Sequence, residues 1–305
     1  MFRRVIVPLD GTRFAEHAVP VAMGLAVADD CRLILAHVDV APLPLDQPHV
    51  VNVNDVTNRD GYTAAILDYL TDVAGRISAS KRVDVEWIIL TGDVPRAIER
   101  LGGDRGADLI VMTSHDRSAL GRLALGSESE RIVRNAGLPV LLVRKSESQL
   151  KLEREADPAT VADPITGQVV RFQNVLVPLD GAPLSEAVLE PAREVAQATG
   201  ARITVMTVRN TSHLSGGPPD FASRAYLDAV ARPLRNAGTV VDVAEVQGHN
   251  VAKAIVQAVT DLAADAIAMA THGRGGLSRI FLGSVAERVL HESTRPLLLT
   301  RPEKK

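Results

Sequence analysis

The sequence is poor in cysteine and in aromatic residues. Cys31 is the one cysteine among 305 residues, so no disulfide can form within the chain, and we expect a reducing, cytoplasmic location. Aromatic residues make up 3% of the chain although 46% of it is hydrophobic, so aliphatic side chains must build the core. Such a composition is typical of buried parallel strands covered by helices, and less typical of antiparallel sandwiches.

Long apolar runs and an excess of one charge are also missing. No uncharged run approaches the length of a membrane span, and Pro8 and Asp10 interrupt the first apolar run too early for the hydrophobic region of a signal peptide. Basic and acidic residues number 34 and 37, which gives a formal net charge of −3, and no basic stripe is present. We therefore predict that the chain binds neither nucleic acid nor a membrane.

What the sequence does contain is a duplication of a whole domain. Several stretches of the first half return in the second, in the same order, which excludes a short-period solenoid. The clearest matches are "RRVIVPLDG" (3–11) with "QNVLVPLDG" (173–181), "ADLIVMTSHD" (107–116) with "ADAIAMATHG" (264–273), and "GLPVLLVRK" (137–145) with "TRPLLLTRP" (294–302).

The repeat predicts two domains, at residues 1–145 and 172–305. The segment between them, 146–171, is charged, contains two prolines and has no sustained apolar period. These properties indicate a linker.

Each half alternates short apolar runs with helical patterns. In the second half "NVLVPL" (174–179) has the length of a buried strand, and apolar residues at helical spacing follow over 184–199. Five strands alternating with helices predict an α/β fold of two tandem, doubly wound, five-stranded parallel sheets of the Rossmann type, and fold precedent gives the strand order 3-2-1-4-5. Pro20 and Pro191 fall inside the first helix of each half and are expected to kink it.

Two of the repeated loops follow strands, at the edge where such sheets bind ligands. "LDG" follows the first strand, and "THGRGGLSRIFLGSVAERVL" (271–290) follows the fourth. Gly273 would let the backbone pass close to an anion, while Gly283 and Ser284 stand at the start of a helix, whose free N–H groups and dipole favour a phosphate. This pattern indicates a phosphate-binding site.

Each feature also has a purely structural interpretation. Residues 284–287 and 127–130 fit a capping box, so both serines could simply begin a helix. Residues 273–276 could be a turn, and the pair Asp180–Gly181 is common in turns. The combination of an acid, a glycine loop and Gly-Ser at one crevice, in both halves, favours the binding interpretation.

Both halves resemble universal stress protein domains, and the chain resembles a tandem, two-domain member of that family. Nucleotide-binding members carry glycine, two residues, glycine, nine residues, then glycine and serine or threonine. Here Ala270 replaces the first glycine, and Gly273, Gly283 and Ser284 hold the other places. The resemblance implies an ATP-binding regulator of the stress response, with Mg²⁺ or Mn²⁺ on the phosphates, and no catalytic residue. A slow ATPase and a scaffold without nucleotide are the alternatives.

The resemblance also implies a role for each matching position of the second half. Asp180 would contact the ribose or the adenine, and the backbone around Val208 would meet the adenine edge. The remaining cofactor-binding positions are Ala270, Gly273, Arg274, Gly276, Gly283, Ser284 and Val285.

The first half departs from this pattern. Thr113 and Asp116 replace both early glycines, and Glu128 stands where the second half has Val285. A carboxylate about 4 Å from a phosphate costs roughly 1 kcal/mol in water and about 4 kcal/mol near a protein surface, unless Arg117 or a divalent ion neutralises it. We therefore predict a competent second site and a weaker first one. The positions that still match in the first half are Asp10, Val38, Gly126 and Ser127.

An apolar strand near the end of each half bears on assembly. A strand such as "PLLLTR" (296–301) at the edge of a sheet needs a partner or a cover. Because related domains often dimerise through this strand, we expect an intramolecular pseudo-dimer of the two halves or a homodimer of the chain.

Overall fold

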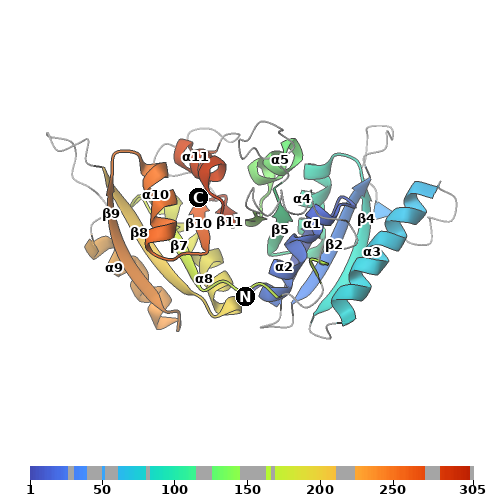
Figure 1. Cartoon of the computed structure of the whole chain (residues 1–305), viewed down its shortest axis with the longest axis horizontal. Helices are drawn as coiled ribbons and strands as arrows, with labels where there is room; N and C mark the ends of the chain where they lie inside the picture. Colours follow the sequence, from blue (N-terminus) through green and yellow to red (C-terminus); the bar gives the residue numbers. More distant parts are fainter. Residues whose placement is uncertain are drawn as a thin grey trace. The chain divides into compact units, whose positions relative to one another are not determined.

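The fold is that of a computed structural model, in which the described residues form two compact units. Of these residues, one unit comprises those within 2–114 and 126–170, and the other comprises those from 171 onwards together with Met1. The first is coloured blue to green and the second yellow to red in Figure 1. The structure describes residues 1–26, 31–39, 50–51, 61–79, 83–114, 126–144, 163–165, 169–210, 224–271 and 282–302.

The first unit is a parallel sheet with one short antiparallel addition. Within it the strand order is β3-β4-β2-β1-β5-β6. Without β3, which pairs antiparallel with β4, this is the predicted order 3-2-1-4-5. The two-residue strand β3 was not predicted. The strands are β1 (Arg4–Pro8), β2 (Arg32–Asp39), β3 (Val50–Val51), β4 (Asp84–Thr91), β5 (Leu109–Thr113) and β6 (Val140–Val143).

Helices connect these strands and cover them. Helix α2 contacts β1, β2, β5 and β6, α3 contacts β2 and β4, and α4 packs on α5. In the described part of the chain, no helix has the length and apolar character needed to cross a bilayer. The helices of the first unit are α1 (Arg13–Glu16), α2 (Ala18–Ala26), α3 (Gly61–Ala79), α4 (Val94–Arg105) and α5 (Ser127–Asn135).

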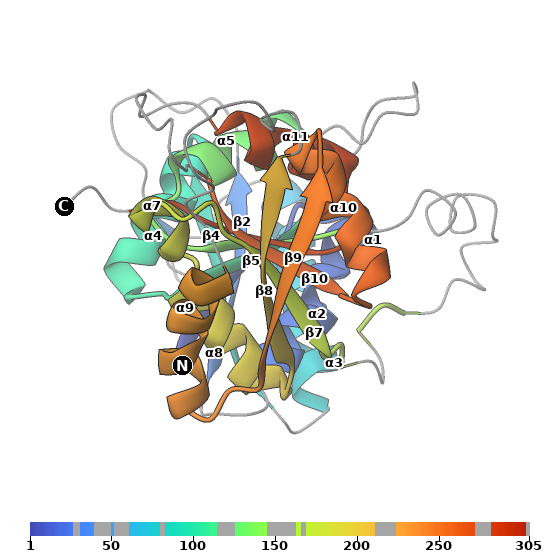
Figure 2. The same cartoon turned by 90° about the vertical axis from the view of Figure 1, so that its left-hand side faces the viewer.

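The second unit repeats the arrangement: its parallel strands are in the order β9-β8-β7-β10-β11, which is again 3-2-1-4-5. Figure 2 shows α8 and α9 on one side of β8 and β9, and α10 on the other. The predicted fold class is thus confirmed. The elements are β7 (Asn174–Pro178), α7 (Pro183–Glu186), α8 (Leu189–Thr199), β8 (Arg202–Asn210), α9 (Arg224–Asn236), β9 (Val241–Gly248), α10 (Val251–Asp261), β10 (Ala266–Ala270), α11 (Ser284–Glu292) and β11 (Leu297–Thr300).

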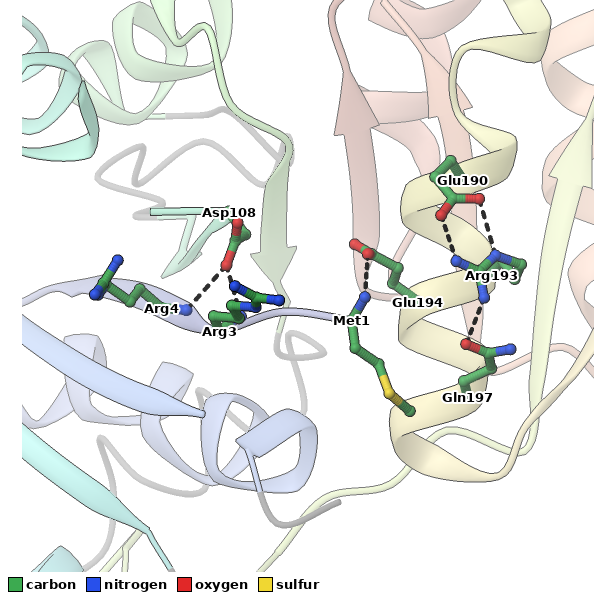
Figure 3. Close-up of polar contacts among 8 residues, drawn as sticks. All are labelled: Met1, Arg3, Arg4, Asp108, Glu190, Arg193, Glu194 and Gln197. Atoms are coloured by element: carbon green, nitrogen blue, oxygen red, sulfur yellow. Dashed lines mark hydrogen bonds and ion pairs between the residues drawn. The ribbon is translucent and has the colours of Figure 1, made fainter. Parts of the chain in front are cut away.

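A carboxylate aligns the first and fourth strands of each sheet. Asp108, just before β5, accepts hydrogen bonds from the backbone N–H groups of Arg3 at 2.6 Å and Arg4 at 3.0 Å (Figure 3). Asp265, just before β10, accepts from residues 173 and 174 at 2.7 and 3.1 Å. The repeated Ala-Asp pair therefore fixes the register of β1 on β5 and of β7 on β10.

The predicted first helix is divided in both units. Helices α1 and α2 are separated at His17, and α7 and α8 at residues 187–188. Pro20 and Pro191 have no N–H to donate to the carbonyl four residues earlier. Those carbonyls belong to Glu16 and Ala187, which lie at the breaks. The expected kink is thus present as a break between two helices.

Part of the predicted linker, 146–171, packs on the first unit. Ile165 is buried, Asp163 accepts a hydrogen bond from Arg76 of α3 at 2.7 Å, and the N–H of Val170 donates to the carbonyl of Pro20 at 3.1 Å. A Cβ on Gly24 of α2 would lie 1.9 Å from the carbonyl oxygen of Val170. Residues 145–162 and 166–168 lie outside the described part, and the domain limits at 145 and 172 stay predictions.

We expect Gly24→Ala to destabilise the first unit. The helix-propensity gain of about 1 kcal/mol is outweighed because the added methyl group collides with backbone, so we expect a net loss of about 1–3 kcal/mol in the free energy of unfolding. Gly75→Ala in α3 is the matched control, since a Cβ there meets no atom within 4 Å. Urea denaturation followed by circular dichroism measures both. Equal stabilisation by the two variants would contradict the close approach.

Candidate functional site

The carboxyl end of β7 turns at Asp180 and Gly181. Gly181 has φ +80°, in the left-handed region that favours glycine. The Oδ1 atom of Asp180 accepts a hydrogen bond from the N–H of Ala182 at 2.9 Å. The turn thus holds the half-buried carboxylate at the edge of the sheet.

Strand register brings three of the predicted residues to this edge. The N–H of Leu179 donates to the carbonyl of Met206 at 2.8 Å, so Asp180 is level with the end of β8, where Val208 lies. The pairing of β7 with β10, continued to its end, sets Ala270 opposite Leu179. Asp180, Val208 and Ala270 therefore lie at or near the carboxyl ends of three neighbouring strands.

The amino end of α11 reaches the same edge. The N–H of Gly283 donates to the carbonyl of Thr271, the residue after β10, at 2.7 Å. Gly283 is the N-cap of α11, and no side chain caps this helix. Ser284 and Val285 begin the first turn, whose N–H groups and positive dipole end can bind an anion.

The capping-box interpretation of the two serines is wrong. A capping box needs the serine at the N-cap with its hydroxyl on a backbone N–H. Instead Gly126 and Gly283 are the N-caps of α5 and α11, and Ser127 and Ser284 are the first residues inside the helices.

The first unit builds the same edge with different side chains. The N–H of Leu9 donates to the carbonyl of Ala36 at 2.8 Å, so Asp10 and Val38 are placed as their counterparts are. Thr12 donates to Oδ1 of Asp10 through its N–H at 2.9 Å and its hydroxyl at 2.6 Å. Ala182 stands at the matching position in the second unit and has no hydroxyl to donate. The first turn of α5 also holds Glu128, which places a carboxylate at the helix end that would bind an anion.

Some predicted site residues lie outside the described part of the chain, and their positions stay predictions. Within the described ranges, no group of three or more histidine, cysteine, aspartate or glutamate residues is placed to hold a metal ion. The undescribed positions are Gly273, Arg274 and Gly276 in the second half, and Asp116 and Arg117 in the first.

Sequence reasoning missed a tyrosine beside each aspartate. The hydroxyl of Tyr226 on α9 donates to Oε1 of Glu186 on α7 at 2.8 Å. The pKa of the Tyr226 hydroxyl is raised, first by burial, then by its hydrogen bond to Glu186 and by the charges of Glu186 and Asp180. Tyr69 on α3 also has a raised pKa, again first from burial and then from nearby carboxylates. The signal was a repeated Tyr-Leu pair, at 69–70 and 226–227.

Because Ser284 is not a cap, we expect Ser284→Ala to change the free energy of unfolding by less than about 0.5 kcal/mol. Asn250→Ala is the comparison, since the Asn250 side chain caps α10 by accepting from the N–H of Lys253 at 3.1 Å. Its loss should cost about 1 kcal/mol. Urea denaturation measures the two variants, and a larger loss for Ser284→Ala would restore the capping interpretation.

Comparison with known proteins identifies the family. The universal stress protein family model matches residues 1–144 and 171–301. A universal stress protein of Mycobacterium tuberculosis is 25% identical over 309 residues, covering 94% of this chain and 97% of that protein. One of Thermus aquaticus is 32% identical over 156 residues, covering 47% of this chain and 100% of that protein. A solved universal stress protein from Archaeoglobus fulgidus, 20% identical, has a TM-score of 0.64 over 99% of this chain and 97% of its own. The chain therefore belongs to the universal stress protein family and carries two of its domains in tandem.

Proposed function

We propose that the chain is an ATP-binding regulator of the stress response, and that its second domain holds the nucleotide. The main support is that Asp180 and the uncapped amino end of α11 lie at one edge of the same sheet. A carboxylate accepts hydrogen bonds from neutral hydroxyl groups, whereas a helix amino end attracts negative charge. A ligand with a sugar at one end and phosphates at the other suits both places.

In this proposal each side of the site takes one part of the ligand. Asp180 accepts from the ribose or adenine, and the backbone at Val208 meets the adenine edge. Mg²⁺ or Mn²⁺, bound with the nucleotide, would neutralise phosphate charge. The phosphate side comprises Ala270, Gly273, Arg274, Gly276, Gly283, Ser284 and Val285, of which 273, 274 and 276 lie outside the described residues.

The first domain is proposed to be the weaker site. Thr12 already donates two hydrogen bonds to Asp10, so a ligand hydroxyl must compete for the same oxygen. Glu128 adds negative charge in the first turn of α5, where a phosphate would lie beside Gly126 and Ser127.

We further propose binding without turnover, and domains at 1–145 and 172–305 joined by the linker 146–171. Hydrolysis needs a side chain that orients water at the γ-phosphate. The described residues proposed for the phosphate side, Ala270, Gly283, Ser284 and Val285, carry neither a carboxylate nor an imidazole. The last strands of the sheets, β6 and β11, are proposed to mediate an intramolecular pseudo-dimer or a homodimer.

Removing the proposed ribose acceptor should weaken ATP binding. A hydrogen bond to a charged group contributes about 1.5–3 kcal/mol, so Asp180→Ala should raise the Kd of the tighter site by roughly 10-fold or more. Asp10→Ala, the matched change in the other domain, should leave that Kd within about twofold. Isothermal titration calorimetry with Mg-ATP measures both. A larger loss for Asp10→Ala would reverse the assignment of the two sites.

Placing an aspartate in the glycine loop of the second domain, as the first domain has at Asp116, should also weaken nucleotide binding. Gly273→Asp brings the charge of Asp116 to the matching position, and one such carboxylate costs about 1–4 kcal/mol. We expect mass spectrometry to find ATP released from the purified wild-type protein and little from the variant. Normal ATP in the variant would contradict the comparison of the loops. Phosphate released in a single turnover would favour a slow ATPase, and no nucleotide in either protein would favour a scaffold.

A further inference from the structure

Both domains place a tyrosine and a glutamate beside the aspartate of the Asp-Gly turn. Glu16 ends α1 and Glu186 ends α7, each six residues after its aspartate. The tyrosine comes from the long helix that follows the second strand, as Tyr69 on α3 and Tyr226 on α9. The two pairs occupy matching places in the repeat, but they are bonded differently.

In the second domain, hydrogen bonds at the two ends of α7 and the helix backbone between them connect the tyrosine to the aspartate. Tyr226 donates to Glu186 at 2.8 Å. In the same short helix, Ser185 donates through its N–H at 2.9 Å and its hydroxyl at 2.8 Å to the carbonyl of Ala182. The N–H of Ala182 in turn donates to Asp180 at 2.9 Å. Tyr226 thus fixes one end of α7, and Asp180 lies at the other end.

Helix α7 depends on such an external contact. It is four residues long, and Ala182 at its N-cap provides no side-chain cap. A single helical turn is marginal in water, because its nucleation is not repaid by later hydrogen bonds. A tie to the 13-residue helix α9 therefore limits the motion of α7 and of the adjoining turn.

Helix α1 of the first domain is held by other means. Thr12 caps it, accepting from the N–H of Ala15 at 3.2 Å. Buried Glu16 pairs with Arg76 at 3.0 Å, and that arginine also bonds to Asp163. The hydroxyl of Tyr69 is buried beside Glu16, but among the described residues it has no acceptor in good hydrogen-bonding geometry. The repeat places Pro233 at the position of Arg76, so this position provides no cation for Glu186.

We propose that Tyr226 is a positioning residue of the nucleotide site, which holds α7 through Glu186 and so keeps the Asp180 carboxylate directed at the adenosine part of the ligand. This rests on the proposed function. Tyr69 has no equivalent role, because Thr12 and Arg76 hold α1. The chemical consequence is selective: the adenosine side of the site depends on Tyr226, whereas the phosphate side, at the amino end of α11, does not.

The test compares Tyr226→Phe with Tyr69→Phe in the full chain. Titration calorimetry is run with Mg-ATP and with inorganic tripolyphosphate, which has no adenosine part. We expect Tyr226→Phe to weaken ATP binding roughly 3- to 10-fold, as for one lost hydrogen bond, with the tripolyphosphate affinity unchanged. Tyr69→Phe should bind both ligands as the wild type does.

Two variants of Glu186, the acceptor of the Tyr226 hydrogen bond, test whether a conservative change keeps ATP binding. Glu186→Gln keeps an oxygen that can accept from Tyr226 and should bind ATP almost as the wild type does, whereas Glu186→Ala should match Tyr226→Phe. Equal weakening of both ligands by Tyr226→Phe would overturn the proposal and leave a general structural role. ATP binding by Tyr226→Phe at wild-type strength would also overturn it, with the proposed function intact. A wild-type chain that binds no ATP would refute both.

Discussion

The candidate sites depend on the strand register that the carboxylates of Asp108 and Asp265 impose on the first and fourth strands of each sheet. Each accepts from the N–H groups of the first residue of the central strand and of the residue before it, at distances between 2.6 and 3.1 Å, and so locks that strand against the fourth. A register shift of one residue moves every residue along the strand and turns every side chain to the opposite face of the sheet. The lock at the amino ends therefore determines which residues meet at the carboxyl ends, where Asp180 and Ala270 lie.

Duplication has kept this backbone frame and changed the groups that satisfy its carboxylates. In the first domain the acceptors are engaged from within the domain, because Thr12 donates to Asp10 and Arg76 pairs with Glu16. In the second domain the matching positions are Ala182 and Pro233, neither of which has a side-chain donor. Two sheets of the same topology thus present different hydrogen-bonding capacity at equivalent edges.

Features that depend on local sequence patterns could be predicted from the sequence, whereas contacts between residues far apart in the chain could not. The strands could be read from apolar runs and repeats, since burial on both faces leaves a continuous apolar signal, whereas their order came from fold precedent. The helix break follows from proline. The site positions at strand ends follow from register. In contrast, the capping-box pattern misled because the glycine before each serine takes the N-cap. Contacts such as Tyr226–Glu186, 40 residues apart, and Gly24 with Val170 leave no periodic trace.

Arg76 shows why residues outside a binding motif decide what the motif can do. Its guanidinium bonds both to Glu16, at the end of α1, and to Asp163, in the segment that follows the first domain. Burial of an unpaired carboxylate is costly, so Glu16 requires this cation or an equivalent donor. The same arginine therefore anchors the following segment and neutralises an acid near the first site. In the second domain Tyr226 donates to the matching Glu186, so the two domains hold equivalent acids with different donors.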